Sequence, residues 1–425
     1  MTSLNVLVIA YYFPPMGLSG VQRISKFIKY LPEFGWCPIV LTSNSPIYYA
    51  FDDSLLNELE AKNIKIYRTD EDLSKIKKEK GNRKINYPSK FRQKIQSRLL
   101  QTVLQPDSRR IWAKYAIQKA EQIFSENQID AILATAPPFT DFLIANKLSK
   151  QYDIPYILDY RDLWVDNPYY FYATPFHKNY AITLEEKILL NASRTIVITR
   201  DMKNRMINRY RFLNHNDISI IPHGFDKEDF ILAQNNAKKS KKFVITHSGV
   251  FSADLTPKYF FKAVNALINE KPEIKNDLEI RLIGILQKNY LKQIEKLGLS
   301  DIIKTTGYIE HIEAVQNLIE ADVLWFMVPN SIVTPSRFYE YLGAKKPMII
   351  SSPVSDLTKI AESTNGAIIT NFNDADAIKS SILNLYNKWK VNQLPKVDEK
   401  SIEKFERKLL TQQLAKELAY SVKFR

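Results

Sequence analysis

The sequence predicts an α/β protein with two domains, each built around a parallel β-sheet. Its 425 residues are many for a single hydrophobic core. Short, continuous apolar runs rich in β-branched residues recur along the chain, and they have the form of strands buried on both faces. The runs alternate with polar or helical segments, a rhythm typical of a sheet covered by helices. A lysine-rich stretch, residues 233–242, stands between the two sets of runs and is expected to be a surface loop.

The composition limits the compartment and the chemistry. A single cysteine, Cys37, cannot form an internal disulfide, which favours a reducing, cytoplasmic location. Five scattered histidines and one cysteine give no zinc-ligand spacing, so we expect no metal. No apolar run reaches the roughly 18 to 20 residues that span a bilayer. Residues 1–15 lack the basic leader and the cleavage site of a signal peptide, and we expect them to contain the first strand.

The net charge of +14 favours polyanionic partners. Nucleic acid, anionic lipid and phosphorylated small molecules all satisfy that condition. The chain has no zinc-finger, RNP-like or basic-zipper pattern, so we expect no nucleic-acid partner.

The first apolar run, residues 4–12, predicts a strand that is followed by a loop and an amphipathic helix. The loop carries Gly17 and Gly20 in a Gly-x-x-Gly pattern. This differs from the dinucleotide fingerprint Gly-x-Gly-x-x-Gly, so a nicotinamide dehydrogenase fits poorly. The loop either cradles a phosphate or is a tight turn that packs the helix on the strand.

Residues 37–43 and 63–69 predict the next two strands, and a basic segment follows them. From Lys75 to Arg98, ten Lys or Arg stand against one acid, Glu79, with aromatic and aliphatic residues between them. The segment is either a solvated insertion or a contact with an anionic membrane. On a membrane each basic residue would add about 1 kcal/mol before screening.

Strand patterns resume at residues 129–135, 155–161 and 195–199. Asp141 follows the first of these, and Asp159, Arg161 and Asp162 lie at the end of the second. Open α/β sheets hold their ligands at such carboxyl ends. The three residues of the second group either orient a substrate or form a buried ion-pair network that holds a loop.

The second half repeats the α/β rhythm, and three glycines fall at strand ends: Gly249, Gly284 and Gly307. The predicted strands there are residues 242–249, 278–284, 302–308, 322–328, 347–351 and 366–370.

The stretch 334–352 follows one of these strands and opens a short helix. Thr334 or Ser336 is expected to cap the helix, whose free N–H groups would then face an anion. Arg337 and Glu340 lie one turn apart, which offers a guanidinium for phosphate and a carboxylate for two ribose hydroxyls. The plainer alternative is an ion pair between Arg337 and Glu340 within the helix.

This stretch resembles the nucleotide-sugar site of family-4-like glycosyltransferases with the two-Rossmann-domain (GT-B) fold. The shared pattern is a basic residue, two residues, Glu-Tyr-Leu, a small residue and Lys-Pro. The loop after the first strand and the motif Asp-aromatic-Arg-Asp-x-Trp match the same family in order. The resemblance implies an acceptor-side domain over residues 1–222 and a nucleotide-sugar-binding domain over 223–390, facing across a cleft. It also implies that residues 391–425 form a helix that crosses back to the first domain.

The terminal helix is expected to place six apolar residues on one face, and the alternative is a coiled-coil or partner helix. These residues are Ile402, Phe405, Leu409, Leu410, Leu414 and Leu418.

The resemblance further implies a metal-independent, cofactor-free hexosyltransferase that is expected to retain anomeric configuration. A sugar would pass from a nucleotide diphosphate donor to a glycan or lipid-linked acceptor in surface polysaccharide or glycoconjugate synthesis, at the inner face of the membrane. The candidate donor-binding residues are Gly17, Gly20, Gly249, Lys258, Thr334, Ser336, Arg337 and Glu340. The candidate acceptor-side residues are Arg23, Asp159 and Arg161, and the candidate catalytic residues are Asp162 and Asp141.

The sequence departs from the family at three places. Val250 or Leu255 occupies the usual arginine position, and no histidine stands near Asp141, so no base is assigned. Ile332 replaces a glutamate that contacts the donor sugar in relatives, which leaves room for a deoxy or otherwise less polar sugar. Two alternatives therefore stay open: a nucleotide-sugar epimerase or phosphorylase of the same fold, and a non-catalytic nucleotide-sugar-binding module.

Overall fold

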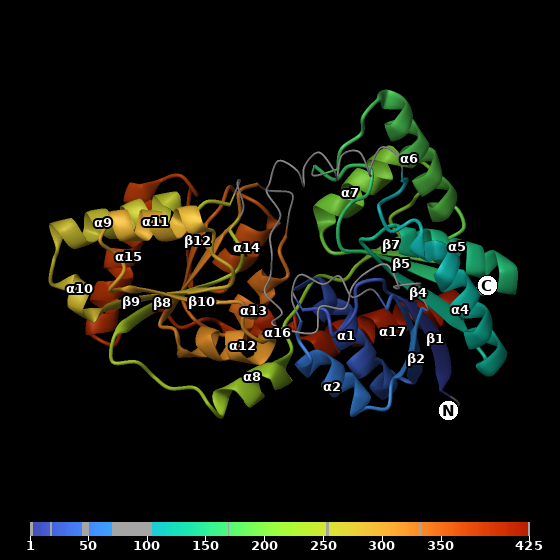
Figure 1. Cartoon of the computed structure of the whole chain (residues 1–425), viewed down its shortest axis with the longest axis horizontal. Coiled ribbons are helices and arrows are strands. Elements are labelled where there is room, and N and C mark those ends of the chain that lie inside the picture. Colours follow the sequence, from blue (N-terminus) through green and yellow to red (C-terminus); the bar gives the residue numbers. More distant parts are fainter. Residues whose placement is uncertain are drawn as a thin grey trace. The chain divides into compact units, whose positions relative to one another are not determined.

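The computed structural model describes residues 3–17, 19–44, 51–69, 104–168, 170–251, 255–330 and 334–423 (Figure 1). The chain forms two compact units. Unit 1 comprises Met1–Pro222 and Lys408–Arg425, and unit 2 comprises His223–Arg407.

Unit 1 is built on a sheet whose described strands are all parallel, in the order β3-β2-β1-β4-β5-β6-β7. These strands are β1 (Leu4–Ile9), β2 (Trp36–Thr42), β3 (Lys65–Arg68), β4 (Ala131–Ala136), β5 (Tyr156–Tyr160), β6 (Arg194–Val197) and β7 (Ile218–Ile220). Successive residues of β1 face different cores, because Leu7 and Ile9 pack in one cluster while Val6 and Val8 pack in another. A strand buried on both faces must be apolar throughout, which is why its sequence shows no alternation.

The connections of unit 1 are mostly helical, as parallel strands require. They are α1 (Ser19–Tyr30), the 3₁₀ turn η1 (Leu31–Phe34), α2 (Ser54–Glu60), α4 (Trp112–Glu126), α5 (Thr140–Tyr152), α6 (Pro175–Leu189) and α7 (Arg200–Arg209). The final helix α17 (Arg407–Lys423) packs with α1 on one face of the sheet, whereas α4 and α5 pack on the other.

Unit 2 holds the second parallel sheet, in the order β10-β9-β8-β11-β12-β13. Its strands are β8 (Phe243–Ser248), β9 (Leu278–Ile283), β10 (Ile303–Gly307), β11 (Val323–Met327), β12 (Met348–Ser351) and β13 (Ala367–Thr370). In both sheets the chain starts near the middle, runs to one side and then restarts on the other. The strand order therefore reverses between β1 and β4 in unit 1 and between β8 and β11 in unit 2.

Helices cover both faces of this second sheet (Figure 1). On one face pack α9 (Lys258–Glu270), α11 (Lys288–Lys296) and α15 (Ala375–Lys390). On the other pack α8 (Lys227–Gln234), α12 (His311–Glu320), α13 (Arg337–Gly343), α14 (Asp356–Glu362) and α16 (Glu399–Glu403). The short α10 (Ile274–Asp277) leads into β9. The predicted α/β class with two parallel sheets is confirmed.

The predicted single terminal helix is wrong. The chain forms α16 and then α17, with Lys404–Glu406 between them. Ile402 and Phe405 pack in the core of unit 2, whereas Leu410, Leu414 and Leu418 pack in that of unit 1. The backbone must change direction to serve two cores. Leu409, expected on the apolar face, is 43% exposed.

Candidate functional site

The carboxyl edge of the unit 2 sheet is built from closely packed glycine backbones. The Gly249 N–H donates to the Ile283 carbonyl at 2.8 Å, and the Gly284 N–H donates to the Gly307 carbonyl at 2.9 Å. A Cβ at Gly284 would lie 2.5 Å from the Gly249 oxygen, and Gly284 has a φ of +116°. The backbone needs glycine there for both steric and conformational reasons. This edge includes the point between β8 and β11 where the strand order reverses, the usual ligand position in such sheets.

Helix α13 starts at this edge, and of the two predicted caps, Thr334 or Ser336, the prediction for Ser336 is wrong. Ser336 precedes the helix in an αR backbone conformation, and its side chain makes no capping hydrogen bond. The first turn closes tightly instead, because the Pro335 carbonyl accepts from Phe338 and the Ser336 carbonyl accepts from Tyr339, both at 3.1 Å.

Arg337, on the first turn of α13, lies directly over Gly249. A Cβ built on Gly249 would be 2.4 Å from Nη1 of Arg337 and 2.9 Å from its Cζ. Among the described residues, Arg337 forms no ion pair with Glu340, so the plainer interpretation of this pair gains no support. Because Gly249 has no side chain, there is room for the guanidinium at the end of β8.

Glu340 faces a histidine rather than Arg337. Its Oε1 lies 3.7 Å from Nδ1 of His311, and Nε2 of His311 lies 3.1 Å from Oδ2 of Asp229. The Glu340 and Asp229 side chains are 13% and 5% exposed, so the imidazole stands between two mostly buried carboxylates. The imidazole therefore links Glu340 of α13 to Asp229 of α8.

His247, near the end of β8, is a second histidine at this edge. Its Nδ1 lies 2.9 Å from the Trp325 carbonyl, which can only accept, so Nδ1 carries the hydrogen. Burial, opposed by that hydrogen bond and helped by the charge of Arg337, lowers the pKa of His247 to about 3. The imidazole is therefore neutral at neutral pH. Its Nε2 has no partner among the described residues and lies 3.1 Å from the position of a Cβ on Gly249, beside the Arg337 guanidinium.

Tyr341 fixes α13 to the sheet. Its hydroxyl oxygen accepts the Ser248 N–H at 2.6 Å, and the hydroxyl lies 3.3 Å from the Trp325 carbonyl. Burial raises the pKa of Tyr341, so the phenol stays protonated and can donate to that carbonyl. The tyrosine of the Glu-Tyr-Leu pattern thus joins α13 to the end of β8 and to the middle of β11.

The side chains of the remaining donor-side candidates are exposed or half-buried. Lys258 is the first residue of α9, and its side chain is exposed. Thr334 and Ser336 are half-buried just before α13. Ile332 lies outside the described residues.

In unit 1, the structure brings Arg23 and Asp159 together in a buried ion pair. Nη2 of Arg23 lies 2.8 Å from Oδ1 of Asp159, and the two side chains are 0% and 1% exposed. Arg23 also donates to the carbonyls of Ile221 and Pro222, at 2.9 and 2.7 Å, and Thr135 donates to Asp159 at 2.8 Å. The sequence left Asp159 either orienting a substrate or belonging to a buried ion-pair network, and these contacts favour the network, with Arg23 as its cation.

Arg161 joins loops in the same way. Its guanidinium donates to the carbonyl of Gly20 in the first turn of α1 and to those of Ala136 and Pro137 at the end of β4. A Cβ on Gly20 would meet Arg161 only at an ordinary contact of 3.7 Å. Gly17 is buried just before α1. No described contact tests a phosphate role for either glycine, so that role stays a prediction.

The two candidate catalytic carboxyl groups differ in exposure. Asp141 has no exposed surface, and its Oδ2 accepts the Tyr11 N–H at 2.9 Å. Burial raises the pKa of Asp141 well above its usual value, and the nearby Asp107 adds to that rise. Asp162 is half-buried, and burial raises its pKa against the attraction of Arg161. A catalytic role for either residue stays a prediction.

Sequence reasoning missed His247, His311 and Asp229. One signal was present, because His247 stands two residues before Gly249 at the end of a predicted strand. No comparable signal marks His311 and Asp229, which come from two helices and meet only through packing.

Two family models match the chain, side by side. Residues 86–229 match Glycosyltransferase Family 4, and residues 228–403 match Glycosyl transferases group 1. With the two parallel sheets, these matches define the class of protein as a glycosyltransferase of the GT-B fold. The chain belongs to the family-4-like members of that class. A search of curated proteins finds no match.

Solved structures of low sequence identity share the fold over the whole chain. The glycosyltransferase from Rickettsia africae is 14% identical with a TM-score of 0.64, covering 99% of both chains. Anabaena HepE, solved with UDP and glucose, is 14% identical with a TM-score of 0.63, covering 98% of this chain and 99% of its own. The UDP-GlcNAc 2-epimerase from Neisseria meningitidis, solved with UDP-GlcNAc, is 13% identical with a TM-score of 0.57, covering 98% and 100%.

Proposed function

We propose that the protein transfers a hexosyl group from a nucleotide diphosphate-sugar to a glycan or lipid-linked acceptor in surface polysaccharide or glycoconjugate synthesis. The observation that carries the proposal is the placement of Arg337 over Gly249, with Glu340 one turn further on, where the strand order of the unit 2 sheet reverses. A diphosphate leaving group concentrates negative charge as the glycosidic bond breaks. A fixed guanidinium at that position would stabilise it without reorganisation.

The two matching family models support a nucleotide-sugar donor, as do the complexes of HepE with UDP and glucose and of the epimerase with UDP-GlcNAc. We also propose metal-independent chemistry with retention of configuration, in which side-chain cations take the place of a metal at the diphosphate. Incubation of the protein with a panel of donors and a lipid or glycan extract tests the reaction. Proton NMR of the anomeric signal of the product tests retention. Epimerisation without an acceptor would instead identify an enzyme of the epimerase type.

Glu340→Gln is expected to weaken binding of the donor nucleotide by about 1.5 to 3 kcal/mol, because a neutral amide loses charge-assisted hydrogen bonds to the ribose hydroxyls. Titration calorimetry with the nucleoside diphosphate measures the change. Glu362→Gln alters an exposed acid of the same unit and is the matched control. Equal affinities for wild type and Glu340→Gln would exclude a ribose contact.

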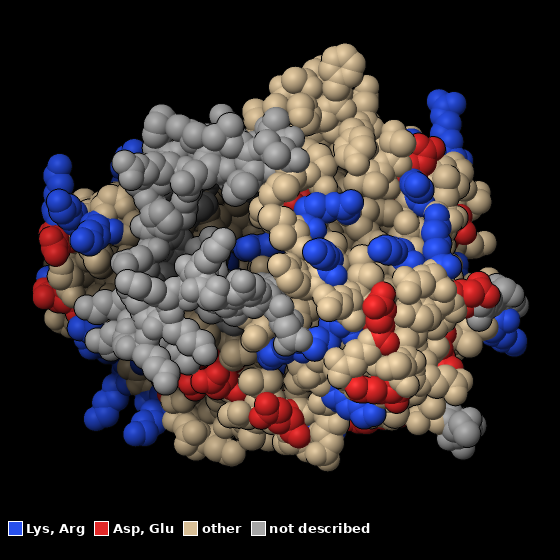
Figure 2. Space-filling model, turned by 45° about the vertical axis from the view of Figure 1, so that its right-hand side comes forward, with Lys and Arg blue, Asp and Glu red and all other residues tan. Residues whose placement is uncertain are grey.

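We further propose that the protein acts at the inner face of the membrane through residues 75–98, which lie outside the described residues. Among the described helices, none is long and apolar enough to cross a bilayer. On the face drawn in Figure 2, basic and acidic side chains are interspersed over the described surface.

Replacing Lys77, Lys78, Lys80, Arg83 and Lys84 with Gln is expected to reduce co-sedimentation with anionic vesicles, most strongly at low salt where charges are least screened. The control removes the same charge from exposed lysines of unit 2: Lys271, Lys288, Lys292, Lys296 and Lys304. Equal losses in both variants would show a nonspecific charge effect. A wild type that stays in the supernatant would show that the segment is only solvated.

A further inference from the structure

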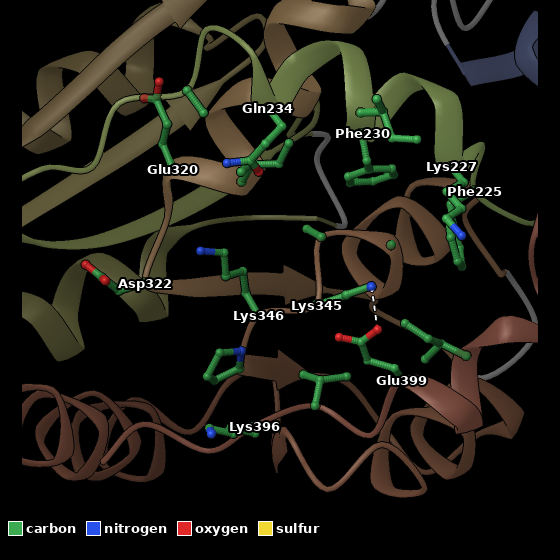
Figure 3. Close-up of a pocket in the computed structure, with 18 of the residues that line it drawn as sticks. Phe225, Lys227, Phe230, Gln234, Glu320, Asp322, Lys345, Lys346, Lys396 and Glu399 are labelled. Atoms are coloured by element: carbon green, nitrogen blue, oxygen red, sulfur yellow. Dashed lines mark hydrogen bonds and ion pairs between the residues drawn. The ribbon is translucent and has the colours of Figure 1, made fainter. Parts of the chain in front are cut away.

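A pocket of about 1000 Å³ lies at the amino edge of the unit 2 sheet (Figure 3). It is bounded by α8 and the loop after it, by the residues that lead into β11 and β12, and by residues 394–399 with the start of α16. The strands are parallel, so this edge is the one opposite Arg337. At about 3.3 Å per residue, strands of four to six residues separate the two edges by roughly 13 to 20 Å.

One wall of the pocket is apolar. The apolar residues that line it are Phe225, Phe230, Ile231, Leu394, Val397 and Ile402. A volume of this size and a wall of this kind suit the apolar or planar part of a small organic molecule.

Two neighbouring lysines in the pocket differ in their surroundings. The ammonium of Lys345 lies 2.6 Å from Oε2 of Glu399. The side chain of Lys346 points the other way, into the pocket on the side of Gln234 and Asp322 (Figure 3). Lys346 is half-buried, and its ammonium has no hydrogen bond or ion pair with any described residue.

The acids that line the pocket near Lys346 are already engaged by other groups. Oδ2 of Asp322 accepts the Val244 N–H at 2.9 Å. The carboxylate of Glu320 pairs with Arg281 at 2.6 Å and accepts the Lys238 N–H at 2.9 Å. Burial is the main cause that lowers the pKa of Lys346, and the charge of Lys239 adds to the effect. Asp322 opposes that shift without overcoming it.

We propose that this pocket binds a small organic phosphate, with Lys346 as the main cation for the phosphate and the apolar wall as the seat for its organic part. A partly desolvated ammonium that contacts no carboxylate is unfavourable, and a bound dianion reduces that cost. Lys239 and Lys396 line the same pocket and add positive charge. This site is separate from the donor site of the proposed function, because it adjoins the last residues of α13 and not the first.

Phenyl phosphate is a suitable probe, because it combines a dianionic head with an apolar ring. The full-length protein is reductively methylated with ¹³C, which gives an NMR signal for each lysine, and the Lys346 signal is assigned by its loss in Lys346→Gln. Titration of phenyl phosphate is expected to move the Lys346 signal and to raise the pKa of that lysine. Affinity for phenyl phosphate should fall about 10-fold or more in Lys346→Gln and change less than about twofold in Lys345→Gln.

Phenol, which lacks the phosphate, should produce no saturable shift of the Lys346 signal. Vesicles with phosphatidic acid provide a second arm, since a shift that occurs only with vesicles identifies a lipid headgroup as the source of the phosphate. The same titration in Arg337→Ala should match wild type, which separates this pocket from the donor site. Equal shifts at Lys345 and Lys346, or no shift at Lys346 with either probe, would overturn the proposal.

Discussion

Arg337→Ala is expected to lower kcat/KM about 10²-fold or more, or roughly 3 kcal/mol in transition-state stabilisation. The guanidinium lies over Gly249 at the carboxyl edge of the sheet and forms no ion pair with Glu340 among the described residues, so it is available to a donor diphosphate. By the resemblance to family-4-like glycosyltransferases, Val250 or Leu255 occupies the position of an arginine, so we expect Arg337 to supply a larger share of the charge. Steady-state kinetics with the donor identified by the panel assay measures the loss.

Two companion variants separate charge from geometry. Arg337→Lys keeps the charge but loses the planar fork, and it should retain partial activity. Gly249→Ala keeps Arg337 but places a methyl group 2.4 Å from its Nη1, so the guanidinium must move and activity should fall. The affinity ratio of nucleoside diphosphate to nucleoside reports the diphosphate contact directly. If that ratio is unaltered in Arg337→Ala while the melting temperature falls, Arg337 is only a structural residue.

Arg23→Ala is expected to destabilise the protein by about 3 to 5 kcal/mol, because it leaves the Asp159 carboxylate buried without its cation. The Ile221 and Pro222 carbonyls lose a donor at the same time, so the cost is not confined to the ion pair. Urea unfolding monitored by a probe in unit 1 measures the change in the free energy of unfolding.

The exposed pair Arg205–Asp201 is the control for this substitution. Its side chains are 41% and 45% exposed, and Arg205→Ala should therefore cost less than about 1 kcal/mol. A stable Arg23→Ala variant that binds acceptor poorly would reverse the interpretation of the Arg23–Asp159 network and return both residues to the acceptor side.

The fold was predictable because buried parallel strands leave a strong signal. β11 is apolar throughout and β8 begins with three apolar residues, and each strand is followed by a polar or glycine-containing turn. The break between α16 and α17 was not predictable from spacing. Ile402, Phe405, Leu410 and Leu414 fit one helical face in the sequence, and only their packing into two different cores divides them.

The candidate site was predictable where its residues share one short helix. Arg337 and Glu340 follow from the pattern around Glu-Tyr-Leu, although their roles remain predictions. The approach of Arg337 to Gly249 joins α13 to the end of β8, and no local pattern encodes a distance between two elements so far apart in the chain. The same applies to His311, which stands between carboxylates from α8 and α13.

The membership of α17 in unit 1 sets the order in which the chain can finish folding during synthesis. Unit 1 buries Leu410, Leu414 and Leu418 in the same core as Val6 and Ile24. The ribosome makes all of unit 2 between these two parts, and at roughly 5 to 20 residues per second that interval lasts on the order of 10 to 40 s. Unit 2 can therefore complete its core first. The part of unit 1 that precedes unit 2 must wait, with an apolar face uncovered, until α17 has emerged.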